Sequence, residues 1–170
     1  MLKYCKVRNV KDPNYGTPGS AGLDLFIPND LTIEQLDEKN GRSVYNRPYY
    51  FDGHTLFIFA GRRILIPSGL HFKLDSGMAL IAFNKSGVFT KLGLSVGAAV
   101  VDSDYQGEVH VSLFNTSDKD VSVELGQKIV QFLYVPVTAG GTMNYETLED
   151  LYANETTERG SGGFGSTGVE

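Results

Sequence analysis

The sequence predicts one all-β domain of the sandwich or barrel type. Short strand-forming segments follow one another along most of the 170 residues, and turn-forming groups such as Pro-Ser-Gly separate them about every ten residues. Glycine (20 residues), phenylalanine (10) and tyrosine (9) are abundant, and few segments have helical periodicity. A chain of this length buries roughly two-thirds of its unfolded surface, which is enough to form one hydrophobic core.

Charge and cysteine content narrow the class of function. The formal net charge is −5, so the chain lacks the basic face that a polynucleotide requires, and no nucleic-acid partner is expected. No apolar run approaches the roughly 18 residues of a membrane helix, so no membrane partner is expected either. The single cysteine, Cys5, cannot form an intrachain disulfide. This composition suits a reducing compartment, and we expect a cytoplasmic protein, in the host cytoplasm if its source is viral.

Two β-prone segments open the chain, at residues 2–10 and 21–28, with a loop rich in turn formers at 12–20. Asp24 is the unusual residue here, because it lies between Leu23 and Leu25 in a short apolar strand. An unpaired carboxylate in such surroundings costs several kcal/mol, so Asp24 is expected to be paired or hydrogen-bonded. A structural hydrogen bond and a role near a metal ion are both open.

Residues 30–54 have a different pattern from their surroundings and are interpreted as an insertion. A capping box that begins at Thr32 predicts a short helix over 32–39, which ends at Asn40-Gly41. Asp52-Gly53 predicts a hairpin turn that leads into a strand at 55–59. Several aromatic side chains of this insertion could pack on the domain, cover a sheet edge or contact a protein partner: Tyr45, Tyr49, Tyr50 and Phe51.

The rest of the chain predicts a closely spaced series of strands, at 63–66, 70–74, 79–83, 98–101, 108–115, 121–125 and 129–135. Residues 84–92 are expected to form a helical turn, and 145–152 either a strand or a helical turn. The three histidines (His54, His71 and His110) do not have the spacing of zinc ligands, so no zinc site is expected.

Residues 96–110 carry two carboxylates and an aromatic ring at a tight turn between two apolar arms. If the turn centres near Ser103, Val96 should face His110 and Val101 should face Tyr105. In an ordinary hairpin these aspartates would only accept hydrogen bonds from turn amides. A second candidate is the tail at 159–170, which is either a flexible glycine-serine end or an anion-binding flap with one arginine and one aromatic ring.

Five short motifs decide between these alternatives: Ala-Gly-Leu-Asp-Leu at 21–25, Lys-Ser-Gly at 85–87, Val-Asp-Ser-Asp-Tyr-Gln-Gly at 101–107, Gly-Gln-Lys-Ile-Val-Gln at 126–131, and the tail at 159–168. In this order they resemble the five motifs of the trimeric deoxyuridine triphosphatase (dUTPase) family. The resemblance implies a jelly-roll-like β-clip fold, with the β domain at 1–158 and a flexible nucleotide-closing arm at 159–170. It also implies a homotrimer with shared active sites that hydrolyses dUTP to dUMP and pyrophosphate with Mg²⁺. This reaction limits the incorporation of uracil into DNA and supplies dUMP.

The resemblance also implies a role for each matching residue. Asp102 matches the general base that activates water at the α-phosphorus, and Tyr105 matches the ring that packs on deoxyribose. The main chain that binds uracil is carried by Val96, Val100, Val101 and His110. The phosphate contacts match Lys85, Ser86, Gly87 and Gln131, and Asp24 matches an acid near the water shell of the metal. The closing arm matches Arg159, Phe164, Gly165, Ser166 and Thr167.

Three residues depart from the family pattern. Lys85 stands where arginine is usual, and a lysine lacks the bidentate fork of a guanidinium. Ala99 stands where glycine is common, and His110 is bulkier than the residue that many members carry. Two alternative functions remain at this stage: a relative of the dCTP deaminases, which share the fold, and a nucleotide-responsive regulatory protein that binds a partner through the insertion.

Overall fold

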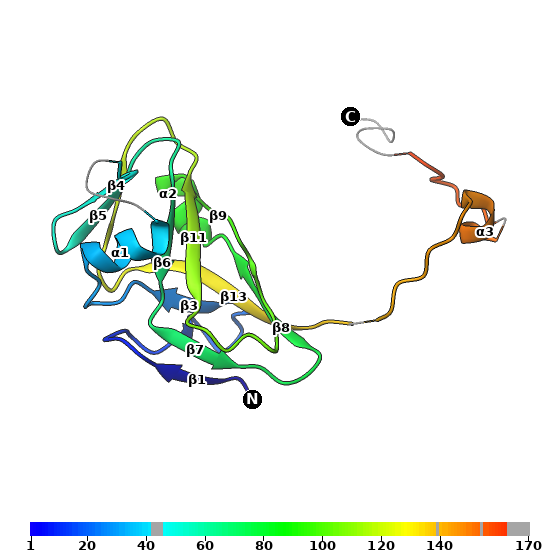
Figure 1. Cartoon of the computed structure of the whole chain (residues 1–170), viewed down its shortest axis with the longest axis horizontal. Coiled ribbons are helices and arrows are strands. Elements are labelled where there is room, and N and C mark those ends of the chain that lie inside the picture. The colour runs from blue at the N-terminus through cyan, green and yellow to red at the C-terminus, as the bar shows by residue number, and fades with distance from the viewer. Residues whose placement is uncertain (42–45, 139, 154, 163–170) are drawn as a thin grey trace. The chain divides into compact units, whose positions relative to one another are not determined.

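A computed structural model describes residues 1–41, 46–138, 140–153 and 155–162 of the chain. It divides into two compact units, Met1–Thr138 and Ala139–Glu170, which are considered separately. The first unit consists mainly of antiparallel strands (Figure 1), so the expected all-β class is confirmed. Among the described residues, no helix has the length and apolar character needed to span a membrane.

The described strands of the first unit form four small antiparallel sheets, with neighbours in the orders β1-β7, β10-β8-β13-β3-β2, β6-β11-β9 and β12-β5-β4. The strand bounds in the first half are β1 Lys3–Lys6, β2 Asn14–Tyr15, β3 Leu23–Phe26, β4 Tyr49–Phe51, β5 Thr55–Ile58, β6 Arg63–Pro67 and β7 Leu70–Lys73. Those in the second half are β8 Met78–Phe83, β9 Leu94–Val96, β10 Val100–Val101, β11 His110–Asn115, β12 Val121–Glu124 and β13 Lys128–Pro136.

Alternation along paired strands builds the core. Val111 and Leu113 of β11 lie directly opposite Ile66 and Ile64 of β6, and all four side chains are buried. Directly paired residues point to the same face of a sheet, so this register brings the four side chains together. The intervening residues of β11, such as Phe114, are more exposed. The alternating pattern is the reason that the sequence predicted these strands.

The insertion folds onto the edge of a sheet. Helix α1 (Ile33–Asn40) has the expected capping box at Thr32, and Gly41 ends it in the left-handed region at φ 56°. The Asn40 side chain donates to the Leu65 carbonyl at 2.9 Å and accepts from the Leu65 N–H at 2.8 Å. Helix α1 lies beside β6, an outer strand of its sheet (Figure 1). The Asn40 side chain therefore fills hydrogen bonds at a strand edge that would otherwise be open.

The aromatic residues of the insertion divide between core and surface. Tyr49 is 2% exposed and donates to Asp37 at 2.8 Å, so this ring packs on its own domain. Tyr50 is 56% exposed, and its ring packs at a tilt against Phe57 of the neighbouring strand. The predicted Asp52-Gly53 turn joins β4 to β5, with Gly53 at φ 96°, and Tyr45 lies outside the described residues.

Other expectations need adjustment. The first strand is confined to Lys3–Lys6 and is exposed throughout, whereas its partner β7 contributes Leu70 and Phe72 to the core. A two-residue strand, Asn14–Tyr15, lies where a loop was expected. Residues 84–92 contain helix α2 (Ser86–Leu92), as expected. Of the two alternatives for 145–152, the helical one is correct, because Thr147 caps helix α3 (Leu148–Tyr152).

Candidate active site

The two arms of the 96–110 hairpin separate from each other. Val96 lies opposite Leu113, Val101 pairs with Leu80 of β8, and His110 pairs with Pro67 of β6. The predicted pairs, Val96 with His110 and Val101 with Tyr105, are therefore wrong. The physical reason is that β10 finds its hydrogen-bonding partner on β8 and not on β11, which leaves the space between the arms open.

The separated arms enclose a pocket of about 290 Å³ with mostly apolar walls. Five residues that the sequence placed in the site line it together, namely Val100, Val101, Asp102, Tyr105 and His110. Further walls come from Leu65, Ala98, Ala99, Val109 and Phe132. Val96 does not line this pocket, and its N–H donates instead to the Asn84 side chain at 2.7 Å.

The turn positions Tyr105 beside the carboxylate. The Tyr105 N–H donates to the Asp102 carbonyl at 3.2 Å, and the phenol donates to the Glu108 carbonyl at 2.9 Å. Gly107 lies against this ring, since a Cβ there would be 2.4 Å from the phenol oxygen. The Asp102 side chain is exposed to solvent, so a carboxylate and an aromatic face border one accessible space.

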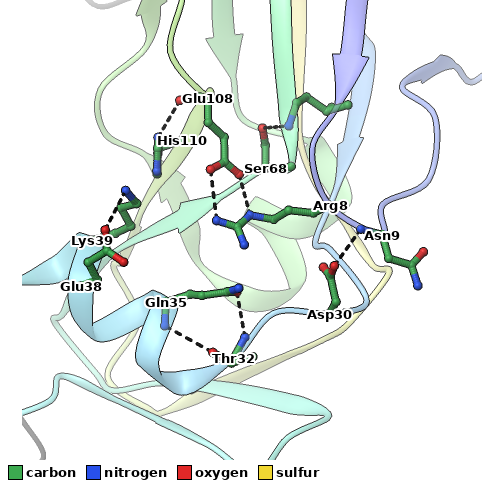
Figure 2. Close-up of polar contacts among 12 residues, drawn as sticks. Arg8, Asn9, Asp30, Thr32, Gln35, Glu38, Lys39, Ser68, Glu108 and His110 are labelled. Carbon is green, nitrogen blue, oxygen red and sulfur yellow. Dashed lines mark hydrogen bonds and ion pairs between the residues drawn. The ribbon is translucent and has the colours of Figure 1, made fainter.

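A nearly buried ion pair supports the second arm (Figure 2). Arg8 donates from Nε and Nη2 to the two oxygens of Glu108 at 2.8 and 3.2 Å, and the Gly69 N–H also donates to Glu108 at 2.8 Å. Burial alone would raise the pKa of Glu108, but the hydrogen bonds from Arg8 and Gly69 outweigh it and lower the pKa. Sequence reasoning missed both ends of this pair, because 100 residues separate them.

Glu108 also orients the histidine of the pocket. His110 Nδ1 lies 2.7 Å from the Glu108 carbonyl, and a carbonyl only accepts, so Nδ1 carries the proton. Nε2 is buried and has no hydrogen-bond partner within the part of the chain that the structure describes. The imidazole therefore forms a fixed wall of the pocket.

The Glu108→Gln variant is expected to have a lower free energy of unfolding than the wild type, by an amount that depends on pH. The Glu108 pKa is lower in the folded chain than its ordinary 4.5, so its contribution is complete above pH 4.5 and disappears as the pH falls through the folded pKa. Urea unfolding should show the variant less stable by on the order of 1–3 kcal/mol at pH 7. The difference in free energy of unfolding between wild type and variant should become smaller below pH 4.5. A difference that stays constant down to pH 3 would contradict this account.

A second group of predicted residues surrounds Asp24. Its side chain is almost fully buried on β3, and Lys85 Nζ and Lys128 Nζ lie 2.8 Å from Oδ1 and Oδ2 respectively. Burial would raise the Asp24 pKa, whereas the hydrogen bonds from Lys128 and Lys85 lower it, and the net direction is down. The expectation that Asp24 must be paired is confirmed.

Gln131 belongs to the same group. It lies directly opposite Asp24, and its side chain donates to the Asn84 carbonyl at 2.9 Å, next to Lys85. Gly22 allows this approach, because a Cβ there would be 2.4 Å from the Gln131 amide oxygen. Ser86 and Gly87 follow Lys85 at the exposed start of α2. The first, second and fourth motifs therefore meet at one place.

The pocket and the Asp24 group are apart within one chain. Val101 lies on β10 and Asp24 on β3, and the sheet order places β8 and β13 between these strands. With strands about 4.8 Å apart, Val101 and Asp24 are separated by roughly 14 Å across the sheet. Where the two groups come nearest in the chain, Phe132 of the pocket and Gln131 of the Asp24 group are successive residues of β13 and point to opposite faces of the sheet.

Only the beginning of the predicted arm is described. Arg159 is exposed in the second unit, and its Nε donates to the Gly162 carbonyl at 3.0 Å. The remaining predicted arm residues lie outside the described residues: Phe164, Gly165, Ser166 and Thr167. Their closing role stays a prediction.

The fold and these groups define a class of protein. It is an all-β protein with a mostly apolar pocket between two separated arms, an exposed carboxylate beside that pocket, and a cluster in which two lysines pair with one buried aspartate. A family model described as dUTPase matches residues 53–168. The deoxyuridine 5'-triphosphate nucleotidohydrolase of Glaesserella parasuis is 36% identical, over 93% of this chain and 87% of that protein. The chain belongs to the dUTPase family.

Two solved structures share the fold. The dUTPase of Staphylococcus bacteriophage 80alpha with dUPNHPP superposes with a TM-score of 0.73 at 18% identity, over 99% of each chain. A mutant dUTPase from phage phi11 of S. aureus has a TM-score of 0.64 at 16% identity, over 88% of this chain and 99% of that one. The latter structure is described as showing the coordination of a structural Mg(II) ion.

Proposed function

We propose that this protein hydrolyses dUTP to dUMP and pyrophosphate, which limits uracil incorporation into DNA and supplies dUMP. The observation that carries the proposal is the pocket that gathers Asp102, Tyr105 and His110 between the separated arms. Membership of the dUTPase family and the name of the Glaesserella relative support it. We place the activity in the cytoplasm, or in the host cytoplasm if the source is viral.

The chemistry follows from the residues of the pocket. Uracil enters the apolar slot, where the main chain of Val100 and Val101 and that of His110 offers its hydrogen-bonding groups. The Tyr105 ring packs on deoxyribose, at the place where a 2′-hydroxyl would clash. The Asp102 carboxylate orients a water molecule and accepts its proton during attack on the α-phosphorus. Most of this work is positioning and electrostatics.

A homotrimer would complete the site. Because Phe132 of the pocket and Gln131 of the Asp24 group point to opposite faces of the sheet, one chain does not bring the two groups around one nucleotide. We propose that the pocket of one subunit meets the Lys85, Ser86, Gly87 and Gln131 group of a second subunit. Arg159 and the arm that contains Phe164 would come from a third. Oligomeric state by light scattering, compared with and without nucleotide, tests this arrangement.

Mg²⁺ is the proposed cofactor, and the residues fit an ion held by the triphosphate and water better than an ion ligated directly by protein side chains. Both oxygens of Asp24 already accept from lysine ammonium groups, and these two cations disfavour direct ligation of a metal ion by the same carboxylate. Among the described residues there is also no group of three or more histidine, cysteine, aspartate or glutamate side chains that could hold a metal. An ion held mainly by the triphosphate and water fits, and it would neutralise phosphate charge. A contact from Asp24 through water is implied only by the resemblance.

One assay tests the proposed reaction against its nearest alternative. Purified protein is incubated with dUTP or dCTP, with and without Mg²⁺, and both pyrophosphate and ammonia are measured. We expect pyrophosphate from dUTP in the presence of Mg²⁺. Ammonia from dCTP would indicate a deaminase-type relative instead.

The Lys85→Arg variant is expected to have equal or higher activity. A guanidinium can keep a hydrogen bond to Asp24 and still offer phosphate a bidentate contact, which could raise kcat/KM by up to about tenfold. Steady-state dUTP hydrolysis measures the effect. A large loss would show that the surroundings of Asp24 are fitted to lysine.

A protein partner at the insertion is the second proposal, and the exposed Tyr50 ring favours it. Deleting residues 30–54 is a poor test, because Leu36 and Tyr49 of this segment lie in the core. The Tyr50→Ser variant leaves both in place. Reduced capture of a partner with unchanged dUTP turnover would support a separate regulatory role for this surface.

A further inference from the structure

Lys128 pairs with Asp24 but is not among the proposed substrate-binding residues, and the backbone directs its side chain toward them. Gln131 lies directly opposite Asp24, so both point to one face of the sheet. Strand alternation would turn Lys128, three residues earlier, to the other face. The register shifts between Lys128 and Val130, and this bulge restores Lys128 to the face of Asp24.

The residues around the bulge confirm this direction. Lys128 lies opposite Phe26, two residues after Asp24, and its ammonium is 5.7 Å from the centre of the Phe26 ring. Val130 lies opposite Leu25 on the other face of the sheet, and both side chains are buried. Bulges often re-aim a side chain next to an active site. Here the bulge delivers a lysine to the group that contains Lys85 and Gln131.

Asp24 holds the two lysines together. Each carboxylate oxygen accepts one ammonium at 2.8 Å, so Lys85 and Lys128 are neighbours despite their like charges. The carboxylate neutralises one of the two, and the three side chains keep a net charge of +1. Both lysine side chains remain partly exposed while Asp24 is buried, so the positive charge faces solvent.

We propose that Lys128 is a second binding residue for the triphosphate of the substrate, beside Lys85, and that Asp24 positions both. The inference rests on the proposed function, which places the triphosphate at Lys85, Ser86 and Gly87. A polyphosphate carries several negative charges along its length, and two adjacent ammonium groups can contact different phosphoryl oxygens. Holding both in advance lowers the rotamer entropy that is lost on binding. Asp24 thus holds both lysines in place beside the proposed triphosphate site.

The test compares Lys128→Gln with two matched variants. Lys11→Gln is the control, because Lys11 also lies over Phe26, at 5.4 Å, but donates to the Gly126 carbonyl and makes no ion pair with Asp24. Lys128→Arg keeps the charge and should keep the function. We measure kcat and KM for dUTP, and the binding of inorganic pyrophosphate by calorimetry. Lys128→Gln should raise KM and weaken pyrophosphate binding roughly tenfold with kcat little changed.

A purely structural role for Lys128 predicts a different result. If Lys128 only neutralises Asp24, the single variant should lose stability while KM and pyrophosphate affinity stay at wild-type values, and this would overturn the proposal. The double variant Asp24→Asn with Lys128→Gln removes the buried charge together with its partner and covers the case in which the single variant unfolds. The proposal requires weak pyrophosphate binding there too, and wild-type affinity would contradict it. Turnover by the wild-type protein tests the proposed function separately.

Discussion

Asp102→Asn is expected to remove most turnover and preserve nucleotide binding. An asparagine has the size of the aspartate but cannot accept the proton of the attacking water, so kcat should fall by on the order of 10²- to 10⁴-fold. The Asp102 side chain is exposed at the pocket, so its replacement disturbs no buried contact. Single-turnover hydrolysis of dUTP measures the chemical step, and calorimetry with dUPNHPP measures binding.

Asp104→Asn is the matched control for this experiment. Asp104 lies two residues away in the same turn, is also exposed, and is assigned to the turn and not to chemistry. Its activity should stay within about twofold of wild type, as expected for an exposed substitution outside the site. If Asp102→Asn retained wild-type turnover, another group would have to act as the base.

Gly107→Ala is expected to disable the site without unfolding the domain. A Cβ at this position would lie 2.4 Å from the Tyr105 phenol oxygen and 2.6 Å from Cζ, so the ring must move. The displaced ring would lose its hydrogen bond to the Glu108 carbonyl and its place against deoxyribose. We expect kcat/KM for dUTP to fall by roughly 10- to 100-fold, since a misplaced positioning group has an effect of this order.

The selectivity of the Gly107 variant gives a sharper readout than its rate. Because Tyr105 is proposed to exclude the 2′-hydroxyl, the ratio of kcat/KM for dUTP over UTP should fall together with the activity. Gly19→Ala is the control, since no heavy atom lies within 4 Å of a Cβ at Gly19. Thermal melting should show both variants folded. Wild-type selectivity in the Gly107 variant would mean that the ring position does not control sugar recognition.

The lysine cluster changes the interpretation of the first motif. Sequence reasoning left Asp24 between a structural hydrogen bond and a metal-associated acid. The structure gives both of its oxygens to lysines, one from the second motif and one from the fourth. These three motifs are therefore coupled through one carboxylate. A substitution in any one of these motifs should therefore change the position of the lysine side chains that the proposed site offers to phosphate.

Local patterns were sufficient for many elements. The cap of α1 joins Thr32 to Gln35, only three residues away, and the turn before β5 depends on Asp52 and Gly53 alone. Such contacts form between neighbours in the chain, so the sequence predicts them directly. The burial of Asp24 between two leucines likewise required a partner, whatever the fold.

The identity of the partners depended on tertiary structure. Lys85 is 61 residues from Asp24, and Arg8 is 100 residues from Glu108, so no local pattern links them. The direction of Lys128 depends on a bulge whose presence is visible only in the register with β3.

The hairpin at 96–110 shows both sides of this division. Its sequence by itself determined that two apolar arms flank a turn with Asp102 and Tyr105, because turn chemistry and strand propensity are local properties. It did not determine that the arms separate. The arms separate because β10 forms its hydrogen bonds with β8 and not with β11, and this pairing joins strands that are distant in the chain. The separation opens the pocket.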